Sequence, residues 1–118
     1  MARLEALLAP VPDGKSLRGI LAQLAHQMGG TFSWLDDRNA SIGLTRGPGA
    51  LPVQVLLELR PRSELGVLVS SREGMGSGAP HSSAVLEEVL AGLQAAAPAA
   101  VVRFRSDRDG PLRQARAA

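Results

Sequence analysis

The feature that most constrains this chain is a change in the spacing of its apolar residues near position 30. Before that point, Leu17, Leu21 and Leu24 recur every three or four residues, which predicts a helix over 16–28. After it, apolar and polar residues alternate, as they do in half-buried strands. The alternating runs are joined by only a few residues, too few for the crossovers that parallel strands need. The sequence therefore predicts a helix followed by an antiparallel sheet.

The remaining elements follow from the same two patterns. A second amphipathic helix is predicted over 83–97, and a short one over 2–9 because Leu4, Leu7 and Leu8 lie at helical spacing. Helices with one apolar side can cover one face of a sheet. The predicted fold class is α+β, a two-layer sandwich in which amphipathic helices cover one face of an antiparallel sheet of about five strands. The strands are expected at 31–36, 40–45, 52–60, 65–71 and 100–106.

The length of 118 residues fits one domain. We expect residues 1–106 to form it and residues 107–118 to form a hairpin strand or a frayed basic tail. The chain has no cysteine, which excludes disulfide scaffolds, thiolate metal sites and cysteine nucleophiles. No apolar run approaches the roughly 18 residues of a membrane span, so the sequence predicts no membrane contact and a cytoplasmic protein.

The charge pattern indicates at most a weak nucleic-acid partner. The formal net charge is only +2, but basic residues gather near the C-terminus. Such a cluster can contact phosphates without reading sequence. The residues concerned are Arg103, Arg105, Arg108, Arg113 and Arg116.

No group of residues indicates catalysis, a metal or a cofactor, so no enzyme is expected. The pair Asp36 and Asp37 fits a hairpin turn better than an acid–base pair. His26 has no recognisable partner. The glycine-rich loop over 72–82 precedes a predicted helix, whose first amides can hold an anion, although a flexible connection is the simpler reading. The residues of that possible anion or ligand loop are Gly74, Gly76, Gly78 and His81.

Two leucines interrupt the polar side of the predicted sheet. Leu56 lies between Gln54 and Glu58, and Leu68 lies between Gly66 and Ser70. Apolar residues at such positions mark a partner or dimer surface, unless the 2–9 helix covers them. On the other side of the sheet, Trp34 is expected to lie buried against the 16–28 helix.

Two families resemble this chain. Residues 65–93, LGVLVSSREGMGSGAPHSSAVLEEVLAGL, are similar to the closing strand, loop and helix of a GAF domain. Residues 17–37, LRGILAQLAHQMGGTFSWLDD, resemble the start of that domain. The resemblance implies a small ligand between the sheet and the segments 46–51 and 72–82, although 46–51 is too short for the family's central helix.

The second resemblance covers nearly the whole chain and is to the type III secretion chaperone-like fold, including its bacterial relatives outside secretion. It is carried by the order of helix, antiparallel sheet and second helix, and by the acidic turns at 36–39 and 107–110. It implies a dimerising module without catalysis. The leading hypothesis is therefore a bacterial interaction or regulatory protein that forms a homodimer or binds a protein partner. The alternative is a GAF-like ligand sensor.

Overall fold

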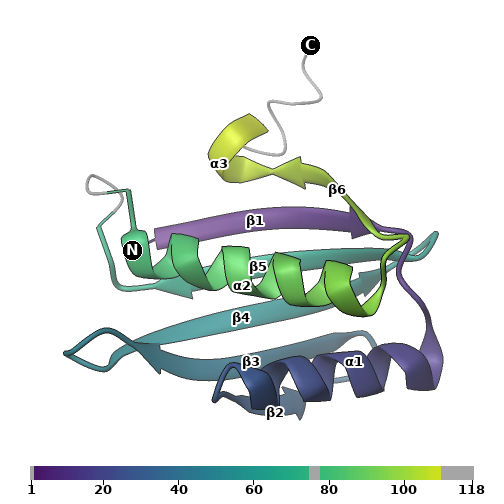
Figure 1. Cartoon of the computed structure of the whole chain (residues 1–118), viewed down its shortest axis with the longest axis horizontal. Coiled ribbons are helices and arrows are strands. Elements are labelled where there is room, and N and C mark those ends of the chain that lie inside the picture. Colours follow the sequence, from purple (N-terminus) through teal and green to yellow (C-terminus); the bar gives the residue numbers. More distant parts are fainter. Residues whose placement is uncertain (1, 75–77, 110–118) are drawn as a thin grey trace.

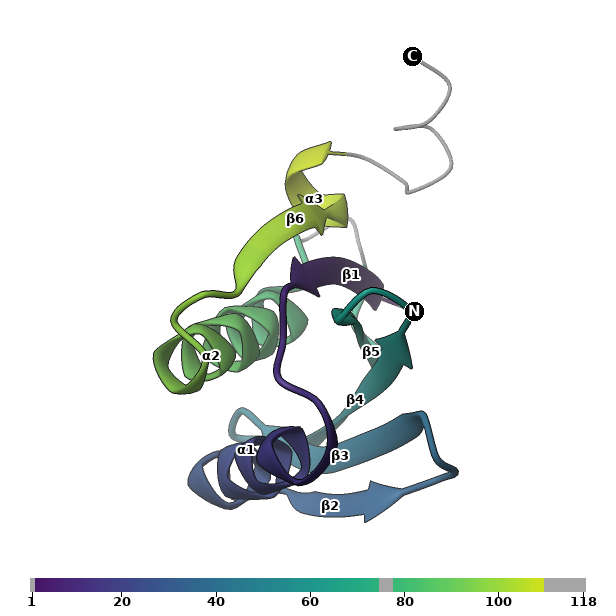
Figure 2. The same cartoon turned by 90° about the vertical axis from the view of Figure 1, so that its right-hand side faces the viewer.

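The structure, a computed structural model, describes residues 2–74 and 78–109. It confirms the predicted α+β class, with one antiparallel six-stranded sheet in the order β2-β3-β4-β5-β1-β6. Both long helices, α1 and α2, lie on the same side of this sheet (Figures 1 and 2). No described helix is long and apolar enough to cross a membrane. In chain order the elements are β1 (Ala2–Ala9), α1 (Gly14–Gln27), β2 (Thr31–Trp34), β3 (Asn39–Arg46), β4 (Leu51–Arg60), β5 (Glu64–Ser71), α2 (Pro80–Ala96), β6 (Val101–Arg105) and α3 (Ser106–Asp109).

The predicted helix over 2–9 is wrong, because this segment is strand β1. It lies between β5 and β6 and pairs antiparallel with both. Leu4 and Leu8 point into the core, whereas Leu7 lies on the opposite face. An isolated helix of eight residues is marginally stable in water. Hydrogen bonding to a neighbouring strand on each edge of β1 outweighs the helical preference of its leucines and alanines.

Strands β2 to β5 form the predicted meander. Each strand pairs antiparallel with the next, and Leu56 on β4 lies directly opposite Leu68 on β5. Val53, Val55 and Leu57 face the helices and are buried. The face that carries Leu56 and Leu68 is the one that α1 and α2 leave uncovered.

The helices pack closely against the sheet and against each other. Leu17 and Leu21 of α1 and Leu86 and Leu93 of α2 are almost completely buried. Gly92 lets the two helices approach, since a Cβ atom there would lie 2.5 Å from Cδ1 of Leu24. The core is therefore the layer between the helices and one face of the sheet.

A bulge in β6 changes the face of the sheet to which its side chains point. Leu7 pairs with Phe104 and Leu8 with Val102, so one residue on β1 corresponds to two on β6. Val102 packs against the core, and Phe104 comes to the face of Leu7. Simple alternation would place Val102 and Phe104 on one side of the strand, and the bulge separates them. Residues 106–109 form the short helix α3, so the segment 107–118, predicted as a hairpin strand or frayed basic tail, begins in a helix. Its residues 110–118 lie outside the described residues.

Trp34 lies on the helix side of the sheet, as predicted, but is only half-buried. Strand β2 is at the edge of the sheet, so the indole has neighbours on one side only. The Arg18 guanidinium of α1 stacks over the ring at 4.9 Å from its centroid. Phe32 meets it edge-on, with 5.6 Å between the ring centroids. The guanidinium and the phenyl ring thus cover parts of the indole that core residues do not reach.

Candidate functional site

An apolar hollow lies on the helix-free face, which we define as the side of the sheet opposite α1 and α2. Its floor includes Leu7, Leu56, Leu68 and Phe104, contributed by four different strands. Leu56 and Leu68 are half-buried although no helix covers them, because each packs beside the other across the β4–β5 ladder. The volume of the hollow is about 390 Å³.

Two features that the sequence patterns do not predict create the hollow. Strand β1 adds Leu7 to this face, whereas a helix over 2–9 would have covered it. The bulge in β6 adds Phe104. Ala2, Leu4, Ala6 and Leu8 occupy alternate positions, which is the spacing of a strand, although Leu7 interrupts the alternation. Leu35, which follows β2, extends the apolar surface and is 60% exposed.

Charged side chains surround this apolar floor. Glu5, Asp36, Glu58 and Arg60 all line the hollow. The Arg60 Nε lies 3.1 Å from a carboxylate oxygen of Glu64, and its Nη1 lies 3.7 Å from one of Glu58. Among the described residues that line the hollow, the one guanidinium is therefore already engaged with two carboxylates, and carboxylates outnumber cations there.

The Asp36 carboxylate has the turn role that its sequence context predicts. It accepts hydrogen bonds from the backbone N–H groups of Arg38 and Asn39, both at 2.8 Å. The Asn39 side-chain amide donates to both of its oxygens. The Arg38 amide first, and then the Asn39 side chain, lower the pKa of Asp36. The carboxylate therefore stays ionised at the edge of the hollow.

The glycine-rich loop brings an internal carboxylate to the start of α2. Glu73 accepts hydrogen bonds from the backbone N–H groups of His81, at 2.8 Å, and Ser82, at 2.7 Å. The Ser71 hydroxyl also donates to it. Burial opposes ionisation, but the bonds from His81 and Ser82 outweigh it and lower the pKa of Glu73. Two of the amides that could hold an external anion are thus engaged by this side chain.

The described residues of the possible anion or ligand loop have different surroundings. Gly76 lies outside the described residues, and Gly78 is a positive-φ residue whose carbonyl accepts a hydrogen bond from Ser83. The ring of His81 packs over Gly47, where a Cβ atom would lie 2.8 Å from Cε1. Gly74 is exposed. His81 thus joins α2 to the β3–β4 turn.

Within residues 2–74 and 78–109, no group of three or more His, Asp or Glu side chains is placed to hold a metal ion. His26 is exposed on α1. Asp37 is also exposed, in the β2–β3 turn.

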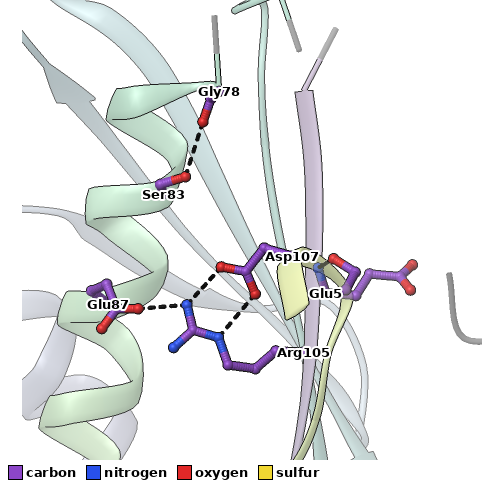
Figure 3. A network of polar contacts seen from close by, with 7 residues as sticks. Glu5, Gly78, Ser83, Glu87, Arg105 and Asp107 are labelled. Atoms are coloured by element: carbon purple, nitrogen blue, oxygen red, sulfur yellow. Dashed lines mark hydrogen bonds and ion pairs between the residues drawn. The ribbon is translucent and has the colours of Figure 1, made fainter. Parts of the chain in front are cut away.

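The C-terminal arginines have different environments. Arg105 is only 6% exposed, and its Nε and Nη2 donate to the Asp107 carboxylate at 3.0 and 2.8 Å. Its Nη2 also pairs with Glu87 of α2, so the guanidinium ties β6 to that helix (Figure 3). Arg105 is therefore a structural cation, contrary to its predicted contact with nucleic acid. Arg103 is exposed, while the Arg108 side chain, Arg113 and Arg116 lie outside what the structure describes.

Comparison of the chain with protein-family models and with curated proteins found no match.

Proposed function

We propose that this chain is a non-catalytic interaction module that binds a protein through the helix-free face of its sheet. The observation that carries the proposal is the pair of leucines, Leu56 and Leu68, directly opposite each other on the face that both long helices, α1 and α2, leave uncovered. Contiguous apolar surface of this kind on a folded domain marks a partner site more often than chance. Leu7 and Phe104 make the patch continuous across four strands.

The concave shape of the hollow suits an apolar side chain that a partner protein would insert into it. A concave apolar floor with a polar rim is the usual arrangement of a protein-binding surface, in which a few buried contacts supply most of the affinity. A regulatory role and the homodimer predicted from the sequence are both forms of this proposal. In the homodimer, the occupant would be a second copy of the chain.

Selection from a displayed random-peptide library tests the proposal. Peptides selected on the whole chain should lose binding at least tenfold to Leu56→Glu and keep it with Gln54→Glu. The control places the same charge on the same face of β4, two residues from Leu56. Peptides that bind both variants equally, or a selection that yields no binder together with a chain that stays monomeric, would overturn the proposal.

The GAF-like sensor is the second candidate, and the volume of the hollow favours it. About 390 Å³ lies within the range of roughly 300–1,000 Å³ for small-molecule pockets. The hollow is lined from β1, β3, β4, β5 and β6 and by residues 35 and 36, and not from 46–51 or 72–82. A sensor would therefore bind its ligand on the helix-free face. Thermal-shift screening of apolar small molecules against the chain and Leu56→Glu would detect it.

A further inference from the structure

We infer that the occupant of the hollow is a segment of another protein that carries arginine or lysine side chains beside a cluster of apolar ones. This inference rests on the proposed function and names the chemistry of its partner. Three observations carry it: the sign of the rim, the contrast between the rim and the whole chain, and the poor fit of a second copy.

Carboxylates outnumber cationic groups among the described residues that line the hollow. Three carboxylates, those of Glu5, Asp36 and Glu58, line the hollow with one guanidinium, that of Arg60. Arg60 lies closer to Glu64, at 3.1 Å, than to Glu58, at 3.7 Å. Glu58 is therefore only weakly paired and can accept a second cation.

Glu5 is a partly exposed carboxylate of the rim with no ion pair among the described residues. Its backbone N–H donates to the Ser106 hydroxyl at 2.9 Å, which holds β1 against α3. Its side chain points away from the Arg105 cluster (Figure 3) and, among the described residues, makes no ion pair. Glu5 pairs with Leu68 across the β1–β5 ladder, so this charge lies beside the apolar floor.

The charge of the rim is opposite in sign to that of the chain. The whole sequence carries a formal net charge of +2, so its overall field repels a basic ligand. A preference for basic segments must therefore come from local groups. Because the Debye length is about 8 Å at physiological ionic strength, a ligand in the hollow responds mainly to the nearby carboxylates.

A second copy of the chain would satisfy this rim poorly. In a two-fold interface each copy contributes the same patch, so the acidic groups of both hollows would meet in one interface. Arg3 lies on the same face of β1 but outside the hollow. Like charges brought together cost free energy and select against that partner. Arginine or lysine at the ends of an apolar segment would instead pair with Glu5 and Glu58.

The test uses three labelled peptides and the intact chain. The first peptide has leucines at its centre and arginines at both ends, and the others carry glutamine or glutamate in place of arginine. Fluorescence anisotropy at low salt should show the arginine peptide binding about five- to tenfold more tightly than the glutamine peptide, with the glutamate peptide weakest. Added salt should reduce this difference, because it screens exposed charge pairs.

A double variant, Glu5→Gln with Glu58→Gln, isolates the rim. It should weaken binding of the arginine peptide about five- to tenfold, a few-fold for each exposed pair, and leave the glutamine peptide unchanged. Asp13→Asn is the control, since it removes one carboxylate at the exposed start of α1. This control should change neither affinity.

Two results would overturn the inference and leave the proposed function standing. One is equal affinity for the arginine and glutamine peptides. The other is light scattering that shows a dimer at low salt which Leu56→Glu dissociates, because the occupant would then be a second copy. If no peptide binds and the chain is a monomer, both the inference and the proposed function fail.

Discussion

Glu73 shows how one side chain decides the local character of a loop. Its carboxylate receives two backbone N–H groups from the first turn of α2, and no residue at the helix N-cap position supplies such a bond. A glycine-rich loop before a helix resembles a phosphate site in sequence, yet here the anion belongs to the chain. The role depends on the placement of Glu73 beside Ser71 and Ser82.

Glu73→Ala should lower the free energy of unfolding by about 1–2 kcal/mol at neutral pH, as the loss of a helix cap does. The pKa of Glu73 is lowered in the folded chain from its ordinary value of 4.5. Its stabilising effect is therefore present above about pH 4.5 and is lost as the pH falls through the folded value. Urea unfolding at several pH values would measure this. A difference between variant and parent that stays constant down to pH 2 would contradict it.

Trp34→Ala should cost about 2 kcal/mol, less than the 3–5 kcal/mol typical of a fully buried aromatic, because the indole is half-buried at a sheet edge. Arg18→Gln should shift Trp34 emission to longer wavelength and increase quenching by iodide, since the guanidinium covers the ring. Chemical denaturation and fluorescence measure the two effects. Lys15→Gln on the same helix is the control, and equal quenching of both variants would argue against the Arg18 contact.

At the scale of elements, the position of β1 has the largest consequences. A strand that completes the sheet between β5 and β6 separates Leu4 and Leu8 from Leu7, whereas a helix would have placed all three on one side. The same strand brings Leu7 and Glu5 to the helix-free face. The binding surface proposed here depends on this one element.

Comparison of Leu8→Ala with Leu7→Ala tests that assignment. Leu8 is fully buried, so its truncation should cost about 3 kcal/mol, within the range for core leucines. Leu7 is half-buried on the hollow, and its truncation should cost about 1 kcal/mol or less. Denaturant unfolding of both variants measures the difference. Equal losses would favour the helical arrangement.

At the scale of the molecule, the two sides of the sheet have different physical roles. One side is buried beneath α1 and α2 and supplies the core (Figure 2). The other combines an apolar floor with an acidic rim on a chain that is weakly basic overall. This division places the proposed binding surface away from the core, so Leu56→Glu should abolish partner binding while changing the free energy of unfolding by less than about 1 kcal/mol.

Self-association should depend on salt in a direction opposite to that of basic-peptide binding. At low salt the acidic rims repel, and we expect a monomer. High salt screens the rims and strengthens apolar contact, so weak association should increase and should disappear in Leu56→Glu. Light scattering across a salt series measures this. A dimer that weakens as salt is added would contradict the expectation.

Alternation along residues 31–71 is enough to predict the meander, because each strand there has one buried face and a short turn to its neighbour. The stripe of Leu17, Leu21 and Leu24 likewise predicts α1. Leu56 and Leu68 can be identified from sequence as apolar residues on a polar face. These features depend on the spacing of apolar residues over short stretches, which is visible in the sequence itself.

The hollow, the rim and the role of Arg105 depend on contacts between residues far apart in the chain. The segment ARLEALLA has spacing compatible with either helix or strand, and pairing with β5 and β6, more than fifty residues away, selects the strand. The bulge that turns Phe104 toward Leu7 exists only in the paired sheet. Arg105 is removed from solvent because Glu87 and Asp107 meet it there. Local periodicity cannot encode such pairings, since their free energy arises only when distant segments are brought together.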